Sequence, residues 1–238
     1  MALSSRKNAR GVVFDLDGTL CNTLGDIAYA ANRALEAVGV PPRPVEAYAE
    51  WVGWGLKRLC AAALGEESGK RFDRLYDVAV TEYNKFPMEQ STIYPGIAEL
   101  LDELTCRGVP FGVVSNKPHD FAVKIIETIY ARWRFVKVVG YTDETRRKPD
   151  PTGVLGIAAA MRLPPASVIL VGDSAVDIET ARNAGMVSVG VTWGFRGPAE
   201  LTQADRIIAH PRELLDLIAD DTQSASQPAG GSQSVRRK

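Results

Sequence analysis

Short apolar runs and helical patterns alternate over the second half of the chain. From Tyr94 onward, runs rich in β-branched residues follow stretches in which apolar residues recur at helical spacing. This alternation predicts a parallel sheet with right-handed crossovers and helices on both faces. The expected helices lie at about 95–106, 120–130, 152–161 and 175–184, and the expected strands at about 109–114, 135–139, 168–171 and 187–191.

The first part of the chain has a different pattern. One short buried strand is expected at 11–14, and the residues after it contain few β-branched runs. Helical spacing there predicts helices at about 23–38, 45–51, 55–64 and 66–85. We therefore expect an α/β protein with a Rossmann-like parallel sheet core, formed by residues 11–20 and 91–218, into which an α-helical domain of residues 21–90 is inserted.

Both ends of the chain lack apolar patterning. Residues 1–10 are polar and contain no apolar segment typical of a signal peptide. Residues 219–238 contain Gln, Ser, Gly and Pro and end in three basic residues. Segments of this composition cannot bury enough surface to offset the entropy lost on ordering. A flexible N-terminal tail (1–10) and a disordered C-terminal tail (219–238) are expected.

Composition narrows the classes of function. Among the 238 residues, 45% are hydrophobic and 24% charged, and the net charge of −1 gives no overall field that attracts nucleic acid or an anionic membrane. The three cysteines are widely spaced and odd in number, which argues against a disulfide framework. No apolar run approaches membrane-spanning length. We expect a cytoplasmic protein, a monomer or homodimer, with neither a nucleic-acid nor a membrane partner.

Two carboxylates follow the first expected strand. Asp15 and Asp17 can face the same side, because successive strand side chains alternate, and Gly18 lets the backbone turn sharply after them. Like charges at this separation raise each other's pKa, so a bound cation is the natural compensation. A surface turn is the alternative interpretation, since Asp-Gly is common in turns.

Polar residues also follow the later strands. Ser115 and Asn116 come after the strand at 109–114, where a hydroxyl and backbone amides can hold a phosphoryl oxygen, although they can equally cap a helix. Lys148 lies in the sequence RRKPDP, whose prolines restrict the loop and aim the lysine. A solvated basic loop is the alternative interpretation of that segment.

Carboxylates recur after the strand at 168–171, in the sequence GDSAVD. Ser174 and Asp177 fit a capping box at the start of a helix. Asp173 has no such structural explanation, which makes it a candidate ligand. Oxygen ligands of this kind suit Mg²⁺, and a pocket with four carboxylates needs a cation before a phosphate dianion can approach.

In order and spacing, these segments resemble the four motifs of the haloacid dehalogenase superfamily of phosphotransferases, over about residues 11–218. The resemblance implies that Asp15 is the nucleophile that becomes an aspartyl-phosphate and that Asp17 is the general acid and base. It implies that Lys148 neutralises charge on the nucleophile and the phosphoryl oxygens. The further implied roles are Mg²⁺ ligation by Asp15, Asp173 and the backbone carbonyl of Asp17, support by Asp177, and substrate binding by Thr19, Ser115 and Asn116.

In the same superfamily a helical insert after the first motif covers the active site as a cap, which implies that residues 21–90 form one. Gly53 and Gly55 lie in a loop that opens a helix, and the adjacent Lys57 and Arg58 add positive charge, so this loop offers partners to a substrate anion. A plain helix–helix turn is the alternative. The loop, the sequence SNKP at 115–118 and the sequence VTWGF at 191–195 resemble the phosphoglycolate phosphatase branch of the superfamily.

The sequence thus predicts a Mg²⁺-dependent phosphomonoester hydrolase that acts through an aspartyl-phosphate on a small phosphate ester, 2-phosphoglycolate first. A pyrophosphatase, a sugar-phosphate phosphatase or a phosphomutase of the same fold stays open. A dehalogenase is disfavoured, because it should not need the second acid at Asp17. From a different class, a non-catalytic sensor of a phosphorylated ligand is the alternative, and the intact set of acids argues against it.

Overall fold

The computed structural model describes residues 9–85, 89–142 and 146–219. Its centre is a six-stranded sheet in the order β5-β4-β1-β6-β7-β8, in which every neighbouring pair is parallel. The predicted α/β fold with a parallel sheet is confirmed. The strands are β1 (Gly11–Phe14), β4 (Phe111–Pro118), β5 (Val138–Tyr141), β6 (Val168–Gly172), β7 (Val187–Val191) and β8 (Arg206–Ile208).

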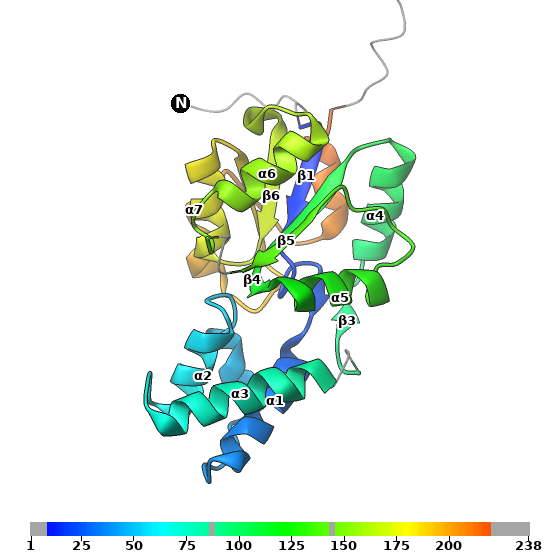
Figure 1. The fold of residues 1–238 in the computed structure, drawn as a ribbon. Helices are drawn as coiled ribbons and strands as arrows, with labels where there is room; N and C mark the ends of the chain where they lie inside the picture. The colour runs from blue at the N-terminus through cyan, green and yellow to red at the C-terminus, as the bar shows by residue number, and fades with distance from the viewer. Residues whose placement is uncertain (1–8, 86–88, 143–145, 220–238) are drawn as a thin grey trace, which may run out of the picture.

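Helices cover both faces of this sheet, because the side chains of each strand alternate between them. Val12 and Phe14 of β1 pack with α4 (Ile97–Cys106) and α5 (His119–Ile129) on one face. Val13, between them, packs on the other face with α6 (Thr152–Met161) and α7 (Ala175–Ala184) (Figure 1). The strand at the middle of the sheet is thus buried from both sides, and its carboxyl end is held in a fixed position.

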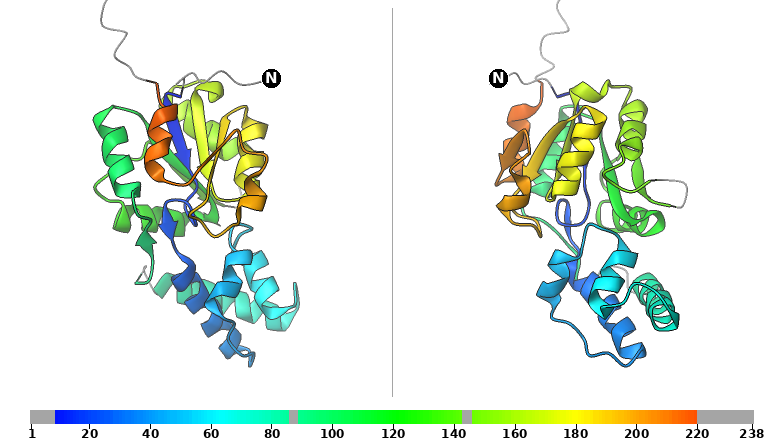
Figure 2. Two further views of the ribbon diagram at one scale, coloured as in Figure 1. Left: turned by 180° about the vertical axis from the view of Figure 1, so that it is seen from behind. Right: turned by 90° about the vertical axis from the view of Figure 1, so that its left-hand side faces the viewer.

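A separate helical module lies beyond the carboxyl ends of the strands (Figures 1 and 2). Its helices α1 (Leu24–Ala37), α2 (Leu56–Leu64) and α3 (Lys70–Lys85) and the 3-10 helix η1 (Val45–Glu50) pack around their own apolar cluster, with Leu35, Tyr48 and Leu75 at its centre. We call residues 24–85 the cap. The short antiparallel strands β2 (Cys21–Asn22) and β3 (Thr92–Ile93) pair where the chain enters and leaves it, and we propose that the cap is a domain of its own.

Some elements differ from the sequence-based expectation. Strand β4 continues to Pro118, so Ser115, Asn116 and Lys117 lie in the strand and not after it. The segment at 45–51 forms a 3-10 helix, and the strand expected at 135–139 begins at Val138. The additional elements β8 and the 3-10 helices η2 (Pro165–Ser167), η3 (Pro198–Leu201) and η4 (Pro211–Leu217) are too short to produce a periodic pattern.

The two predicted tails lie mostly outside the described residues, which begin at Ala9 and end at Ala219. Ala9 itself is buried, and its carbonyl accepts a hydrogen bond of 2.8 Å from the Ala219 amide. The amide of Arg10 donates to the carbonyl of Ser167. The ordered core therefore begins before the first residue of β1. Within the described residues, no helix has both the length and the apolar content that crossing a membrane requires.

Candidate active site

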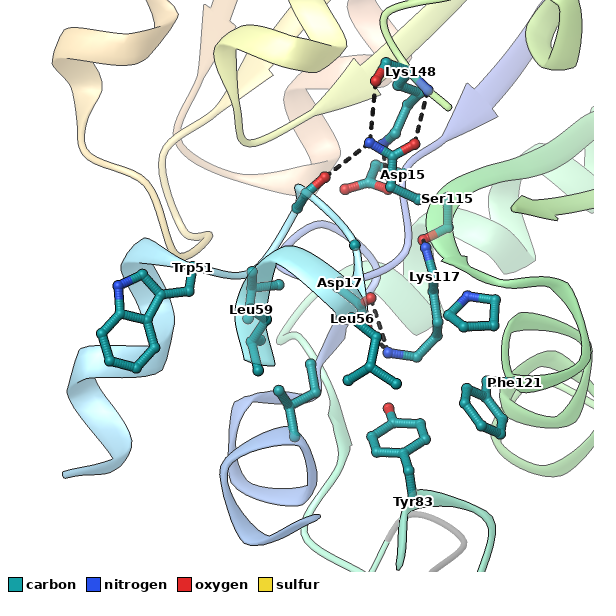
Figure 3. A pocket seen from close by; sticks show the side chains of 16 residues that line it. Asp15, Asp17, Trp51, Leu56, Leu59, Tyr83, Ser115, Lys117, Phe121 and Lys148 are labelled. Atoms are coloured by element: carbon teal, nitrogen blue, oxygen red, sulfur yellow. Dashed lines mark hydrogen bonds and ion pairs between the residues drawn. The ribbon is translucent and has the colours of Figure 1, made fainter. Parts of the chain in front are cut away.

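The candidate residues meet at the carboxyl ends of three neighbouring strands, where ligands of open parallel sheets bind. Asp15 follows β1 at the centre, Ser115 lies in the last half of β4 on one side, and Asp173 follows β6 on the other. Figure 3 shows Asp15, Lys148, Ser115 and Lys117 close together below the sheet. The strands β1, β4 and β6 are not consecutive in the sequence but are neighbours in the sheet, so the sheet topology brings these residues together.

Lys148 bridges two carboxylates. Its Nζ lies 2.6 Å from Oδ1 of Asp15 and 2.6 Å from Oδ1 of Asp177, and all three side chains are buried. Burial alone lowers the pKa of Lys148, but the charges of Asp15 and Asp177 outweigh burial and hold that pKa above the ordinary lysine value. The lysine is therefore a fixed positive charge beside the Asp15 carboxylate.

Asp17 is held by a second lysine that the sequence analysis gave no role. Nζ of Lys117 lies 2.9 Å from both carboxylate oxygens of Asp17. The hydroxyl of Thr23, at the start of α1, donates to Oδ1 of Asp17 at 2.6 Å. Burial alone lowers the pKa of Lys117, but the nearby Asp17 and Tyr83 raise it above the ordinary value. The second acid is thus fixed by one cation and one hydroxyl.

Asp173 faces the same cluster from the end of β6. Burial, followed by the charge of Asp177, raises the pKa of Asp173 to about 7, although the amide of Phe195 donates to its Oδ2 at 2.8 Å. The backbone of Gly18, at φ 88°, approaches so closely that a Cβ there would lie 2.3 Å from this oxygen. A glycine is required at position 18 both for its backbone angle and for this close approach.

The acids form a site that suits a divalent cation. Carboxylate oxygens of Asp15, Asp173 and Asp177 lie within 4.8 Å of one another, and all three residues are buried. Burial and the charges of Asp177 and Asp173 raise the pKa of Asp15 well above its usual range, although Lys148 acts in the opposite direction. Hard oxygen donors in this number fit Mg²⁺. A bound cation would favour the ionised carboxylates and so lower their raised pKa values.

The three predicted substrate-binding residues of the core have different contacts, and only Asn116 joins separate segments. Asn116 accepts the amide hydrogen of Lys148 at 2.7 Å and donates to the carbonyl of Gly53 in the cap at 2.8 Å. The Ser115 hydroxyl oxygen accepts from the Lys117 amide at 3.1 Å. Thr19 is fully buried, and its hydroxyl oxygen has no hydrogen-bond partner among the described residues. An unpartnered buried hydroxyl costs free energy, so it marks a place where a ligand oxygen would be favourable.

The cap lines one side of the pocket that these residues form. Gly53 and Gly55, from the loop before α2, line it as the sequence analysis expected of a substrate-binding loop. The cap otherwise contributes mainly apolar side chains, and the core adds Phe121 from α5 (Figure 3). The apolar residues that the cap contributes are Ile27, Trp51, Val52, Leu56 and Leu59, with the aromatic ring of Tyr83.

Lys57 and Arg58 lie elsewhere. Both are exposed and line a different hollow, on the outer side of α2, together with Arg147. Nζ of Lys57 lies 6.0 Å from the ring centre of Phe72, and the guanidinium of Arg58 lies 5.3 Å from that of Trp54. The structure therefore does not bring these two cations to Asp15, because residues one and two positions after Leu56 project from other faces of the helix.

Comparison with known families agrees with this site. The sequence profile of the family described as haloacid dehalogenase-like hydrolase matches residues 12–191, which include all four acids and both lysines. The chain belongs to this family. The predicted family, and with it the phosphatase class, is confirmed.

Several proteins similar to this hydrolase carry the name phosphoglycolate phosphatase. A protein named phosphoglycolate phosphatase from Escherichia coli O157:H7 is 32% identical over 242 residues, which covers 91% of this chain and 95% of that protein. One with the same name from Chromobacterium violaceum is 32% identical and covers 89% and 97%. A crystal structure from Haemophilus somnus, described as a predicted phosphoglycolate phosphatase, has a TM-score of 0.80, 27% identity and coverage of 88% and 98%.

For this hydrolase, sequence reasoning missed two contacts, those of Lys117 and Thr23 with Asp17. Lys117 stood in the motif that was singled out, two residues after Ser115, so alternation along a strand would have placed both on one face. That signal was hidden because the strand was expected to end at 114. Thr23 gave no signal beyond being a good helix-capping residue.

Proposed function

We propose that this hydrolase is a Mg²⁺-dependent phosphomonoesterase that works through a phosphoryl group carried on Asp15. One observation supports this most: the Asp15 carboxylate lies at the end of the central strand, 2.6 Å from the Lys148 ammonium and beside two further buried acids. Such a carboxylate has a cation partner and a candidate metal site, but its burial leaves it poorly solvated. That is the environment of a nucleophile rather than of a structural ion pair.

The reaction needs two displacements. In the first, an oxygen of Asp15 forms a bond to phosphorus while the bond to the ester oxygen breaks, and Asp17 gives that oxygen a proton. Lys117 then stabilises the carboxylate that remains on Asp17. In the second, Asp17 takes a proton from water, whose oxygen attacks phosphorus and releases the Asp15 carboxylate and phosphate.

The remaining polar residues bind the phosphoryl group. Lys148 offsets negative charge on Asp15 and on the phosphoryl oxygens, and the hydroxyls of Ser115 and Thr19 offer hydrogen-bond donors to those oxygens. We propose Asp15, Asp173 and the backbone carbonyl of Asp17 as the Mg²⁺ ligands, with Asp177 holding Lys148. When bound, the cation supplies positive charge that lets a phosphate dianion approach the acids.

The proposed substrate is 2-phosphoglycolate. Its support is the name shared by relatives that match about nine-tenths of this chain, together with a pocket lined by apolar cap residues.

The cysteines Cys21, Cys60 and Cys106 are all unpaired, which is compatible with the cytoplasm as the working compartment.

A panel of phosphate esters tests the proposal. We expect the largest kcat/KM with 2-phosphoglycolate in Mg²⁺, and no turnover in EDTA. The panel should include pyrophosphate and a hexose phosphate, since a pyrophosphatase or a sugar-phosphate phosphatase would prefer these, and a phosphomutase would return an isomer instead of free phosphate. Full activity in EDTA contradicts the metal requirement. Binding of esters without turnover of any would instead indicate a phospho-ligand sensor.

A further inference from the structure

Lys117 is a buried cation of the pocket that lies against Asp17 and not against the nucleophile Asp15. Among the described residues that line the pocket, the cationic side chains are Lys148 and Lys117. Lys148 is engaged by two carboxylates on the phosphoryl side of the pocket. Lys117 contacts only one, Asp17, and only 5% of its side chain is exposed. A lysine this deeply buried is uncommon unless it is paired, and the partner of Lys117 is the proposed proton donor, Asp17.

The position of Lys117 relative to Asp17 places it beside the leaving group. Asp17 is the proposed donor of a proton to the ester oxygen, so that oxygen must come within hydrogen-bond distance of the Asp17 carboxylate. Nζ of Lys117 lies 2.9 Å from the same carboxylate. Lys117 is therefore next to the organic part of the substrate, on the side away from Lys148 (Figure 3).

The ammonium of Lys117 carries three N–H groups. The two oxygens of Asp17 account for two of them, and the Tyr83 hydroxyl is the partner of the third, which an incoming anion can take over. On its cap side lies Tyr83 of α3, whose ring centre is 4.8 Å from Nζ. Burial raises the pKa of Tyr83 to about 12, so its phenol stays protonated and can donate a hydrogen bond. Two donors, one from the core and one from the cap, thus converge beside the leaving-group position.

We propose that Lys117 and the hydroxyl of Tyr83 bind the carboxylate of the substrate. The inference rests on the proposed function and extends it to the group that distinguishes 2-phosphoglycolate from other small esters. In this substrate the carboxylate is one carbon from the ester oxygen, so an ammonium in contact with the proton donor for that oxygen also reaches the carboxylate. The contact is charge-assisted and involves the buried Lys117 in a pocket with many apolar lining residues, where such contacts are stronger than in water.

The test compares 2-phosphoglycolate with ethyl phosphate, in which a methyl group replaces the carboxylate. Lys117→Met keeps the length of the side chain and removes its charge. Because Lys117 also holds Asp17, some activity is lost on both esters. The expected additional loss of kcat/KM on 2-phosphoglycolate is roughly 10- to 150-fold, carried mainly by KM. Tyr83→Phe keeps the ring beside Lys117 and should add a loss of roughly 3- to 10-fold on 2-phosphoglycolate alone.

Lys124→Met is the matched control. Lys124 also runs from the core to α3, where its Nζ donates to the carbonyl of Asn84 at 3.1 Å, but it does not line the pocket. It should leave the ratio of the two activities unchanged. Equal losses on both esters in Lys117→Met would mean that Lys117 only positions Asp17, and would overturn the inference without touching the proposed phosphatase activity.

A measurement on the wild-type protein covers the case in which Lys117→Met does not fold. Glycolate should inhibit competitively, and its neutral amide, glycolamide, should bind at least roughly 10-fold more weakly. Equal inhibition by both compounds overturns the inference. If the wild-type protein hydrolyses no phosphate ester at all, the proposed function itself has failed, which is a distinct result.

Discussion

The core and the cap contribute different kinds of atoms to the same pocket. The core contributes charged side chains in which each cation is paired with carboxylates. Lys148 lies between Asp15 and Asp177, and Lys117 lies against Asp17. From the cap come apolar side chains, the backbone of the loop at 51–55 and one phenol. The cations that follow this loop, Lys57 and Arg58 in the first turn of α2, line a different hollow. The core therefore holds the charged groups that the proposed chemistry would use, and the cap supplies apolar surroundings of low dielectric constant, in which their interactions are stronger.

Hydrogen bonds between the core and the cap join core side chains to the backbone of the cap. Asn116, Lys124 and Arg196 of the core each donate a hydrogen bond to a backbone carbonyl of the cap, with distances of 2.8, 3.1 and 2.7 Å. Because a carbonyl is present at every position, these contacts do not depend on which side chains the cap carries. Side chains add to the attachment, since the ring centre of Tyr83 in the cap lies 4.8 Å from that of Phe121 in the core, so a change of the cap lining would leave the backbone part of the attachment in place. The comparison predicts severe effects for changes in the core groups and mild ones for changes in exposed cap cations.

The largest expected effect is on turnover in Asp15→Asn. The change removes the proposed nucleophile, and kcat should fall on the order of 10⁴-fold or more on every ester of the panel. In the absence of metal the melting temperature should not fall, because the substitution removes one charge from a crowded acidic group and keeps a hydrogen-bond acceptor for Lys148. Turnover at a large fraction of the wild-type rate would show that the nucleophile is a different residue.

Lys148→Met should have the largest effect on stability. It leaves the buried carboxylates of Asp15 and Asp177 without their shared cation, and the free energy of unfolding should fall by about 3–5 kcal/mol in metal-free buffer. Urea unfolding measures this, and added Mg²⁺ should restore part of the loss. Lys85→Met, at an ion pair with Glu82 where the lysine is 60% exposed, is the control and should cost less than about 1 kcal/mol. Similar costs for the two variants would contradict the buried bridge.

Binding of Mg²⁺ should depend on pH in a stated direction. The cation binds the ionised form of Asp173, whose pKa in the metal-free protein is raised to about 7 by burial and by Asp177. Below that pH a proton competes with the cation, and the raised pKa of Asp15 acts in the same direction. The dissociation constant from calorimetry should be roughly 10-fold larger at pH 6 than at pH 8. Equal constants at the two pH values would contradict an Mg²⁺ site at these acids.

The smallest expected effect is in the cap. Lys57→Ala and Arg58→Ala should each change kcat/KM on 2-phosphoglycolate by less than about 3-fold, because both side chains are exposed and line another hollow. Measurement on ethyl phosphate in parallel shows whether any change is specific to the carboxylate. A loss on 2-phosphoglycolate alone would place the carboxylate at the start of α2, and would count against Lys117.

Sequence reasoning recovered the sheet because its strands are buried on both faces and read as short runs of mainly apolar, β-branched residues, most clearly at 168–171. It recovered the order of the acids for the same reason, since each follows such a run. It located Asp177 in its capping box, which the structure contains together with the bond to Lys148. These features are local in sequence, or follow from topology rules that local patterns already imply.

What could not be predicted depends on side-chain direction and on distant contacts. The end of β4 was placed four residues early, because Asn116 and Lys117 are poor strand formers that tertiary contacts hold extended. Lys57 and Arg58 looked suitable by position and charge, but the rotation of α2 about its axis decides which side chains face Asp15. That rotation is set by the apolar packing of Leu59 and Cys60 in the cap.

The most direct test of the proposed chemistry is to trap the phosphoryl group on the core. A single turnover of 2-phosphoglycolate with Mg²⁺ is quenched in acid at a series of times, and the digested protein is examined by mass spectrometry, in the wild type and in Asp15→Asn. We expect one added phosphoryl group on the peptide that contains Asp15 in the wild type, absent from Asp15→Asn, and both its formation and its decay should be slower in Asp17→Asn, because Asp17 acts first as the acid and then as the base. Release of phosphate with no adduct at any time point, or an adduct on another residue, would contradict the assignment of Asp15 as the nucleophile.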